Sequence, residues 1–261
     1  MRGYGLGGFE ELPSDRVRQH LGVEESTGHQ SARTYIGYMP LIHDIQSSLL
    51  NDEVALGPVM LKLRFLASKL GSAPLEEWVK HETEGYPHEI TVPDYRKLQV
   101  NYIGQFSGAF GSGIKNAPLP LALIGSIAGD HWTEFQFKQS VAAVDKLIGT
   151  SKGKNGGMLS IDCSNLVMLI QGKIYPDMSC LAFEGKLSVA QLSEIQHVVK
   201  NRILELVLEI EKSVPNAISI EVGKPMEEPV EVPKSDVTQI FHQTINGSMT
   251  NVTNAGTIGS L

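Results

Sequence analysis

Residues 188–213 read SVAQLSEIQHVVKNRILELVLEIEKS, and this stretch predicts the longest helix of the chain. It opens with the S-x-x-Q pattern of a capping box, in which Ser188 and Gln191 each bond a backbone amide that the first helical turn leaves unpaired. Apolar residues then recur every three or four positions, at Leu192, Ile195, Val199, Ile203, Leu206 and Ile210. Further apolar residues widen this stripe in the second half. We expect that half to pack on two sides or to pair with another copy.

Three shorter helices with short links are expected before it, over residues 41–49, 56–70 and 74–84. Their apolar residues have helical spacing. The second has Pro58 in its first turn and Gly71 just past its last, which is the usual placement of both residues. The third stops at Gly85, because the following proline prevents continuation. These helices predict a compact helical unit at the start of the folded region.

The region between these helices and the long helix predicts both strands and helices. Apolar and polar residues alternate over 98–102, and the glycine-rich FSGAFGSG that follows is typical of a turn. A helix is then expected around residues 141–148, and short strands at 158–161 and 179–183. The fold class is therefore α+β, with an N-terminal helical unit, a mixed α/β middle, a long C-terminal amphipathic helix, then a linker and a strand-prone tail.

The two ends of the chain differ from this body, which we place at residues 39–214. Residues 1–38 lack periodicity and predict a flexible N-terminal extension. Residues 215–234 are rich in Pro and Glu and predict an extended linker. The last charged residue is Asp236, so residues 235–261 are interpreted as an uncharged assembly tail or, equally, as a flexible polar tail. The assembly residues are expected to be Val237, Ile240, Phe241, Ile245, Met249, Val252 and Ile258.

Composition excludes several classes of protein. The net charge of −7 argues against a broad nucleic-acid surface, and no apolar run is long enough to span a bilayer. Two cysteines, Cys163 and Cys180, are too few for a disulfide framework, which fits a reducing cytoplasm. We expect a cytoplasmic protein without a membrane span.

The densest candidate metal ligands are His81, Glu84 and His88. His81 and Glu84 stand at i, i+3 and share a helix face, but a metal site needs a third ligand in fixed geometry. His88 lies beyond Pro87, so a solvated helix end is the alternative. A second and weaker cluster, Asp130, His131 and Glu134, lies beside Trp132, which favours packing at a chain reversal.

No other catalytic pattern is present at the required spacing. The loop at 149–155 has only three residues between its glycines and Asn155 where a phosphate loop has Ser or Thr. The chain has no G-x-S-x-G elbow, and neither cysteine has a histidine close in sequence. We therefore expect no cofactor and leave the catalytic residues unassigned.

A set of motifs from the third expected helix onward resembles the AbiTii domain of bacterial abortive-infection systems. The distinctive positions are Trp78, Glu82, Gly85, Tyr86, Pro93, Asp94, Tyr95 and Arg96. The resemblance continues through Asn116-Ala-Pro118 and Asn201-Arg202, and it covers roughly residues 39–214. It implies a role in antiphage defence, without catalytic residues that can be carried over.

Resemblance and composition together favour a defence protein without a demonstrable catalytic site. We expect it to act as a homo-oligomer or by binding a phage or host protein. The alternative is a metal-dependent, nuclease-like toxin that uses the region of His81, Glu84 and His88.

Overall fold

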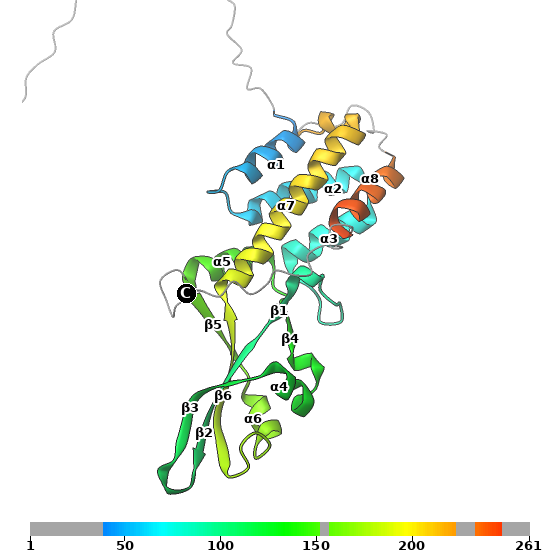
Figure 1. Ribbon diagram of the computed structural model, residues 1–261. Coiled ribbons are helices and arrows are strands. Elements are labelled where there is room, and N and C mark those ends of the chain that lie inside the picture. Colours follow the sequence, from blue (N-terminus) through cyan, green and yellow to red (C-terminus); the bar gives the residue numbers. More distant parts are fainter. Residues whose placement is uncertain (1–38, 152–156, 223–232, 247–261) are drawn as a thin grey trace, which may run out of the picture. The chain divides into compact units, whose positions relative to one another are not determined.

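The computed structural model describes residues 39–151, 157–222 and 233–246, all within one compact unit that runs from Tyr38. Its fold is α+β, as the sequence predicts: α-helices pack around one long helix, and two antiparallel sheets follow them (Figure 1). The expected N-terminal extension, residues 1–38, lies outside the described residues. In the described residues, no helix combines the length and the apolar character that crossing a membrane requires.

The helical part is built around α7 (Val189–Ser213). The predicted capping box is present: the Ser188 side chain accepts from Ala190 N, and Gln191 Oε1 accepts from Ser188 N at 3.0 Å. The neighbouring helices are α1 (Leu41–Leu50), α2 (Leu56–Leu70), α3 (Ala73–Glu84), α5 (Val141–Ser151) and α8 (Lys234–Phe241). Because α7 contacts α1, α5 and α8, most of its apolar stripe is buried within one copy of the chain, whereas Leu208 is exposed.

The main sheet has the strand order β3-β2-β6-β5 and is antiparallel throughout. Its strands are β2 (Asn101–Gly108), β3 (Gly113–Leu119), β5 (Met158–Asp162) and β6 (Met178–Ser188). A second pair joins β1 (Lys97–Gln99) to β4 (Glu134–Gln136). Two short helices, α4 (Leu121–Ala128) and α6 (Ser164–Ile170), contact one another, and α6 packs on β6. Along β2, Tyr102, Gly104 and Phe106 are buried while the residues between them are not, which is the alternation of a sheet with one covered face.

The start of the expected linker belongs to the core, which corrects its assignment as a spacer. Residues Pro215–Ser219 form a 3₁₀ turn, with Ala217 and Ile220 buried. The carbonyl of Ile220 accepts a hydrogen bond from Leu41 N at 3.0 Å, so the chain after α7 returns to the start of α1. A spacer would leave these residues in solvent.

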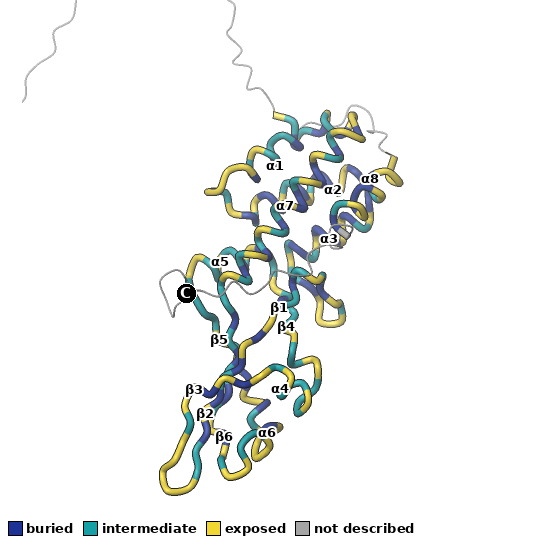
Figure 2. The backbone as a smooth tube through the Cα atoms, in the orientation of Figure 1, coloured by how far each residue is buried: buried dark blue, intermediate teal, exposed yellow. Residues whose placement is uncertain are grey.

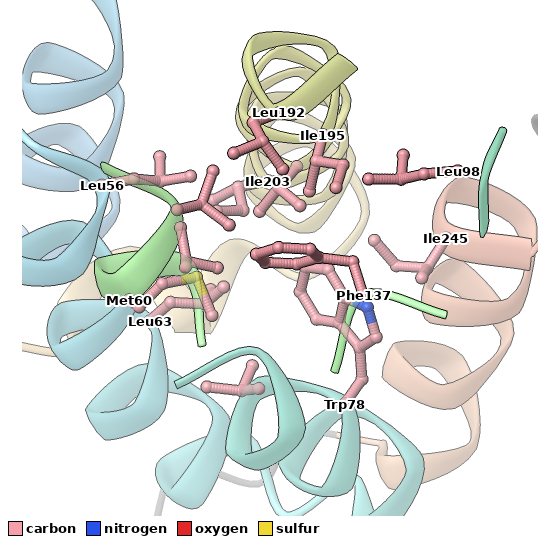
Figure 3. Packing of buried hydrophobic residues seen from close by; sticks show 14 of the residues in the cluster. Leu56, Met60, Leu63, Trp78, Leu98, Phe137, Leu192, Ile195, Ile203 and Ile245 are labelled. Atoms are coloured by element: carbon pink, nitrogen blue, oxygen red, sulfur yellow. The ribbon is translucent and has the colours of Figure 1, made fainter. Parts of the chain in front are cut away.

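The described part of the expected tail is helical, so the strand prediction is wrong there. Helix α8 is followed by a π-helical turn, His242–Asn246. The four apolar residues of this part are buried, namely Val237, Ile240, Phe241 and Ile245. Figure 3 shows Ile245 directed toward Phe137, in the same cluster as Trp78. These side chains serve the fold of one copy, whereas Met249, Val252 and Ile258 lie outside the described residues.

Candidate functional site

Four of the eight motif residues surround the buried carboxylate of a fifth, Glu82, and we call this group the Glu82 cluster: Trp78, Glu82, Tyr86, Tyr95 and Arg96. Glu82 lies on the buried face of α3, and its side chain and that of Arg96 are both 0% exposed. Glu82 Oε1 accepts from the hydroxyls of Tyr86 and Tyr95, at 2.7 and 2.6 Å. Arg96 donates to both carboxylate oxygens, through Nε and Nη2. The buried charge is therefore paired and hydrogen-bonded, as burial of an ion requires.

Further contacts fix the rings around this pair. Trp78 Nε1 donates to the Tyr95 hydroxyl at 3.0 Å, and the Arg202 guanidinium lies 4.4 Å from the centre of the Tyr95 ring. The Arg96 guanidinium lies 5.1 Å from the Tyr86 ring. Both contacts are cation–π geometries. Arg202 belongs to α7, so the cluster joins α3 to the long helix.

The Glu82 cluster also holds the chain that follows β4. Arg96 Nη1 donates to the carbonyls of Phe137 and Gln139, at 3.1 and 2.7 Å. Gly85 permits this approach: its φ is +98°, and a Cβ there would lie 2.9 Å from the carbonyl oxygen of Lys138. The same carbonyl accepts from Tyr86 N at 2.8 Å. The need for glycine at this corner thus comes from the positive φ and from close backbone contact.

The other two motif residues shape the turn that presents Arg96. The Pro93 carbonyl accepts from Arg96 N at 2.9 Å and closes the 3₁₀ turn Asp94–Arg96. Asp94 pairs with Lys97 at 2.7 Å on the surface and does not enter the cluster. Pro93 and Asp94 therefore act through backbone geometry and a surface ion pair.

Electrostatics keep both hydroxyls of the cluster protonated. Burial raises the pKa of Tyr86 and Tyr95 above the ordinary range, and the charge of Glu82 raises both further. Burial alone would lower the pKa of Arg96, but the charge and hydrogen bonds of Glu82 outweigh burial and raise it. The ion pair is closed to solvent, and its hydrogen bonds join α3, the turn at Arg96 and the chain after β4.

An open cleft of about 740 Å³ lies next to this joint. Three segments far apart in sequence form its walls: residues 88–91, residues 130–139 and the end of β5 with Cys163. Tyr102 lines it from β2 and donates its hydroxyl to the Trp132 carbonyl at 2.7 Å. Lys138 Nζ donates to the carbonyls of Pro87, His88 and Ile90, which ties down the 88–91 wall. Fixed backbone therefore frames the cleft.

The charge of the cleft is negative. Four exposed carboxylates line it, those of Glu89, Asp130, Glu134 and Asp162. Lys138 also lines the cleft, but its ammonium already donates hydrogen bonds to the carbonyls of Pro87, His88 and Ile90. Trp132 and Phe135 add half-buried aromatic surface. Carboxylates beside aromatic rings suit a cationic group.

The potential nucleophile of the cleft is not activated. Burial raises the pKa of the Cys163 thiol, and the charges of Asp162 and Glu184 raise it further, so the thiol stays protonated at neutral pH. Burial likewise raises the pKa of Tyr102 to about 12. Neither group is prepared to act as nucleophile or base at neutral pH. The arrangement is suited to binding.

The structure separates the three candidate metal ligands from one another. The His81 ring lies 5.1 Å from the Tyr86 ring, Glu84 accepts from Arg64 at 2.8 Å, and His88 lines the cleft. Among the residues that the structure describes, no group of three or more His, Cys, Asp or Glu side chains is placed to share a metal ion. The three residues of the weaker sequence cluster, Asp130, His131 and Glu134, all line the cleft, but they are not placed to share a metal ion.

Sequence reasoning missed Tyr102, Asp162 and Cys163 as cleft residues, since only strand pairing brings them to residues 130–139. It also missed Arg202, although that residue stands in a segment with family resemblance. A cation in the middle of the apolar face of α7 was the available signal, because a buried arginine requires a partner.

The AbiTii family model matches residues 40–235, a range that contains both the Glu82 cluster and the cleft. The chain belongs to the AbiTii family. AbiTii is a domain of abortive-infection proteins, so the match places the chain among antiphage defence proteins. No curated protein and no solved structure matches this AbiTii chain.

Proposed function

We propose that this AbiTii protein defends against phage by binding, and that the cleft recognises a positively charged segment of a phage or host protein. The observation that carries the proposal is the lining of the cleft: four carboxylates and half-buried aromatic surface stand beside a thiol that is kept protonated. A Lys or Arg side chain entering the cleft would meet both charge and a ring face. Binding of this kind needs no activated nucleophile.

Charge and preorganisation support the choice of ligand. The whole chain carries a net charge of −7, so an acidic cleft on it attracts basic partners over distance. The walls are held by Lys138 and by the Tyr102 hydroxyl before any ligand arrives. A preorganised site loses less free energy in ordering when it binds.

Phage plating tests this function. Bacteria that express the wild-type chain together with its neighbouring genes would be compared with bacteria that express the double variant Asp130→Asn, Glu134→Gln in the same way. We expect protection to fall at least tenfold, because two of the four cleft charges are removed without loss of volume. The matched control, Glu53→Gln with Glu205→Gln, removes two exposed carboxylates outside the cleft lining and should protect fully. Full protection by the cleft variant would refute the proposal.

Self-association is the second part of the proposed function. The expected assembly residues in α8, Val237, Ile240 and Phe241, are buried within one copy, so we look for an exposed surface of the described chain that could carry it. Static light scattering of the purified chain measures this directly: a mass above the 28.4 kDa of one chain supports self-association.

A further inference from the structure

The tip of the β2–β3 hairpin presents one aromatic side chain to solvent. Figure 2 shows the tip between β2 and β3 coloured as exposed. Phe110, in this tip, is fully exposed and has φ = +57°, in the left-handed region that favours glycine. A bulky residue seldom adopts this conformation, and residues held in it cluster at functional sites. Folding of a single copy gains nothing from a phenyl ring placed there, because the ring is not buried.

The base of the same hairpin carries an unfilled groove of about 490 Å³. It is formed by the start of β2 and the end of β3, and its apolar lining includes Ile103, Pro118, Pro120 and Leu121. The two prolines are exposed and the other two residues are half-buried. An apolar groove beside proline rings is a suitable site for an aromatic side chain.

We propose that the β2–β3 hairpin is a homotypic docking element, in which Phe110 of one copy fills this groove on a second copy. Ile103 and Phe110 are seven residues apart, which corresponds to about 23 Å of extended strand, so a copy cannot fill its own groove. Two hairpins that lie antiparallel about a two-fold axis would form both contacts at once. The proposal names the surface for the self-association in the proposed function and rests on that part of it.

Electrostatics favour a second copy as the occupant. Neither the tip, residues 107–114, nor the groove residues at 99–103 and 118–121 include a charged side chain. Contact between them therefore buries no unpaired charge, the usual penalty when two copies of an acidic protein meet. On β2 between tip and groove, Gln105 is polar and uncharged, while exposed Lys115 on β3 and Glu184, opposite Ile103 on β6, border the contact with one charge of each sign.

Light scattering after size exclusion tests the docking element, with Phe110→Ser as the variant and Leu50→Ser as the control. Leu50 is also largely exposed, at the end of α1, so its substitution removes similar apolar surface elsewhere. We expect wild type and control to have at least twice the 28.4 kDa single-chain mass, and the apparent dissociation constant of Phe110→Ser to rise at least about tenfold. Equal masses for all three would overturn the proposal.

A cysteine pair tests the geometry. Phe110→Cys chains mixed with Pro118→Cys chains should form a disulfide-linked heterodimer under mild oxidation, while wild type forms none because Cys163 and Cys180 are buried. Absence of the heterodimer would overturn homotypic docking. A single-chain mass, together with flotation of the wild-type chain on phosphatidylcholine vesicles, would also overturn it and would favour a lipid surface as the partner of Phe110. These outcomes do not bear on recognition by the cleft, because phage plating of the Asp130→Asn, Glu134→Gln variant tests that recognition separately.

Discussion

The Glu82 cluster makes a sharp prediction about stability. Glu82→Gln keeps the volume of the side chain but leaves the Arg96 guanidinium buried without a countercharge. Removing one partner of a buried ion pair reduces the free energy of unfolding by about 3–5 kcal/mol. Domains are stable by only about 5–15 kcal/mol, so this is a large part of the total. At about 2–4 °C per kcal/mol for a chain of this size, we expect the melting temperature to fall by roughly 10 °C.

The same helix supplies the control for this measurement. Glu84 also accepts from an arginine, Arg64, but both side chains are about half exposed. An exposed ion pair contributes at most about 1 kcal/mol, so Glu84→Gln should shift the melting temperature by no more than a few degrees. Thermal melting followed by circular dichroism compares the two variants. Equal shifts for Glu82→Gln and Glu84→Gln would refute the reasoning from burial.

A double variant separates the ion pair from the rest of the cluster. Arg96→Met alone should destabilise strongly, because Glu82 then keeps a buried charge and two carbonyls lose their donor. In the double variant with Glu82→Gln, the loss in free energy of unfolding should be smaller than the sum of the two single losses, because both substitutions remove the same interaction. We expect a coupling free energy of about 2–3 kcal/mol. Additive losses would show that the two side chains stabilise the fold independently.

Three more outcomes follow from the structure. The pKa values of Tyr86 and Tyr95 are raised in the folded chain, so these two hydroxyls ionise first in the unfolded chain. The free energy of unfolding should therefore stay constant up to about pH 10 and then fall by up to about 3 kcal/mol per pH unit. A flat melting temperature between pH 9 and 11.5 would contradict this. Gly85→Ala should lower the free energy of unfolding by roughly 3 kcal/mol, measured in urea, because its φ of +98° and the nearby carbonyl exclude a Cβ; an unchanged midpoint would speak against it. Deleting residues 234–261 should lower the melting temperature by more than 10 °C, since four buried side chains are lost at about 2–5 kcal/mol each; an unchanged melting temperature would contradict this.

Local patterns predicted the longer helices, whereas α4 was not assigned and α8 was expected to be strand-forming. The capping box and apolar spacing of residues 188–213 fix the beginning and end of α7 to within a residue, and Gly71 in the left-handed region ends α2. Such signals are contained in neighbouring residues, so no knowledge of the rest of the fold is needed. The fold class follows from them and from the strand alternation at 98–102.

In the tail, two sequence patterns favour different structures. Val237, Ile240, Phe241 and Ile245 are spaced by three, one and four residues, which is a helical stripe, and Pro233 stands just before it. The lack of charge and the three-residue repeat farther on favoured a strand-forming interpretation. Helical spacing over these positions decides the structure, because it lets all four side chains reach the core together.

The cleft could not be predicted from the sequence. Its walls come from residues 88–91, 130–139 and 161–163, which are brought together by the pairing of β1 with β4 and of β5 with β6. Pairing between strands distant in sequence leaves no local periodicity at the residues that end up facing each other. The motif around Glu82 was visible as a set, but its buried geometry depends on the turn before Arg96.

Contacts connect the motif to the cleft and explain why the two lie in one family domain. Arg96 is held by Glu82 and in turn holds the carbonyls of Phe137 and Gln139. Between these two residues stands Lys138, whose ammonium binds three carbonyls of the 87–90 segment. The buried ion pair thus sets the position of a residue that fixes one wall of the cleft. A change at Glu82 should consequently weaken recognition in the cleft as well as stability, although Glu82 itself is closed to any ligand.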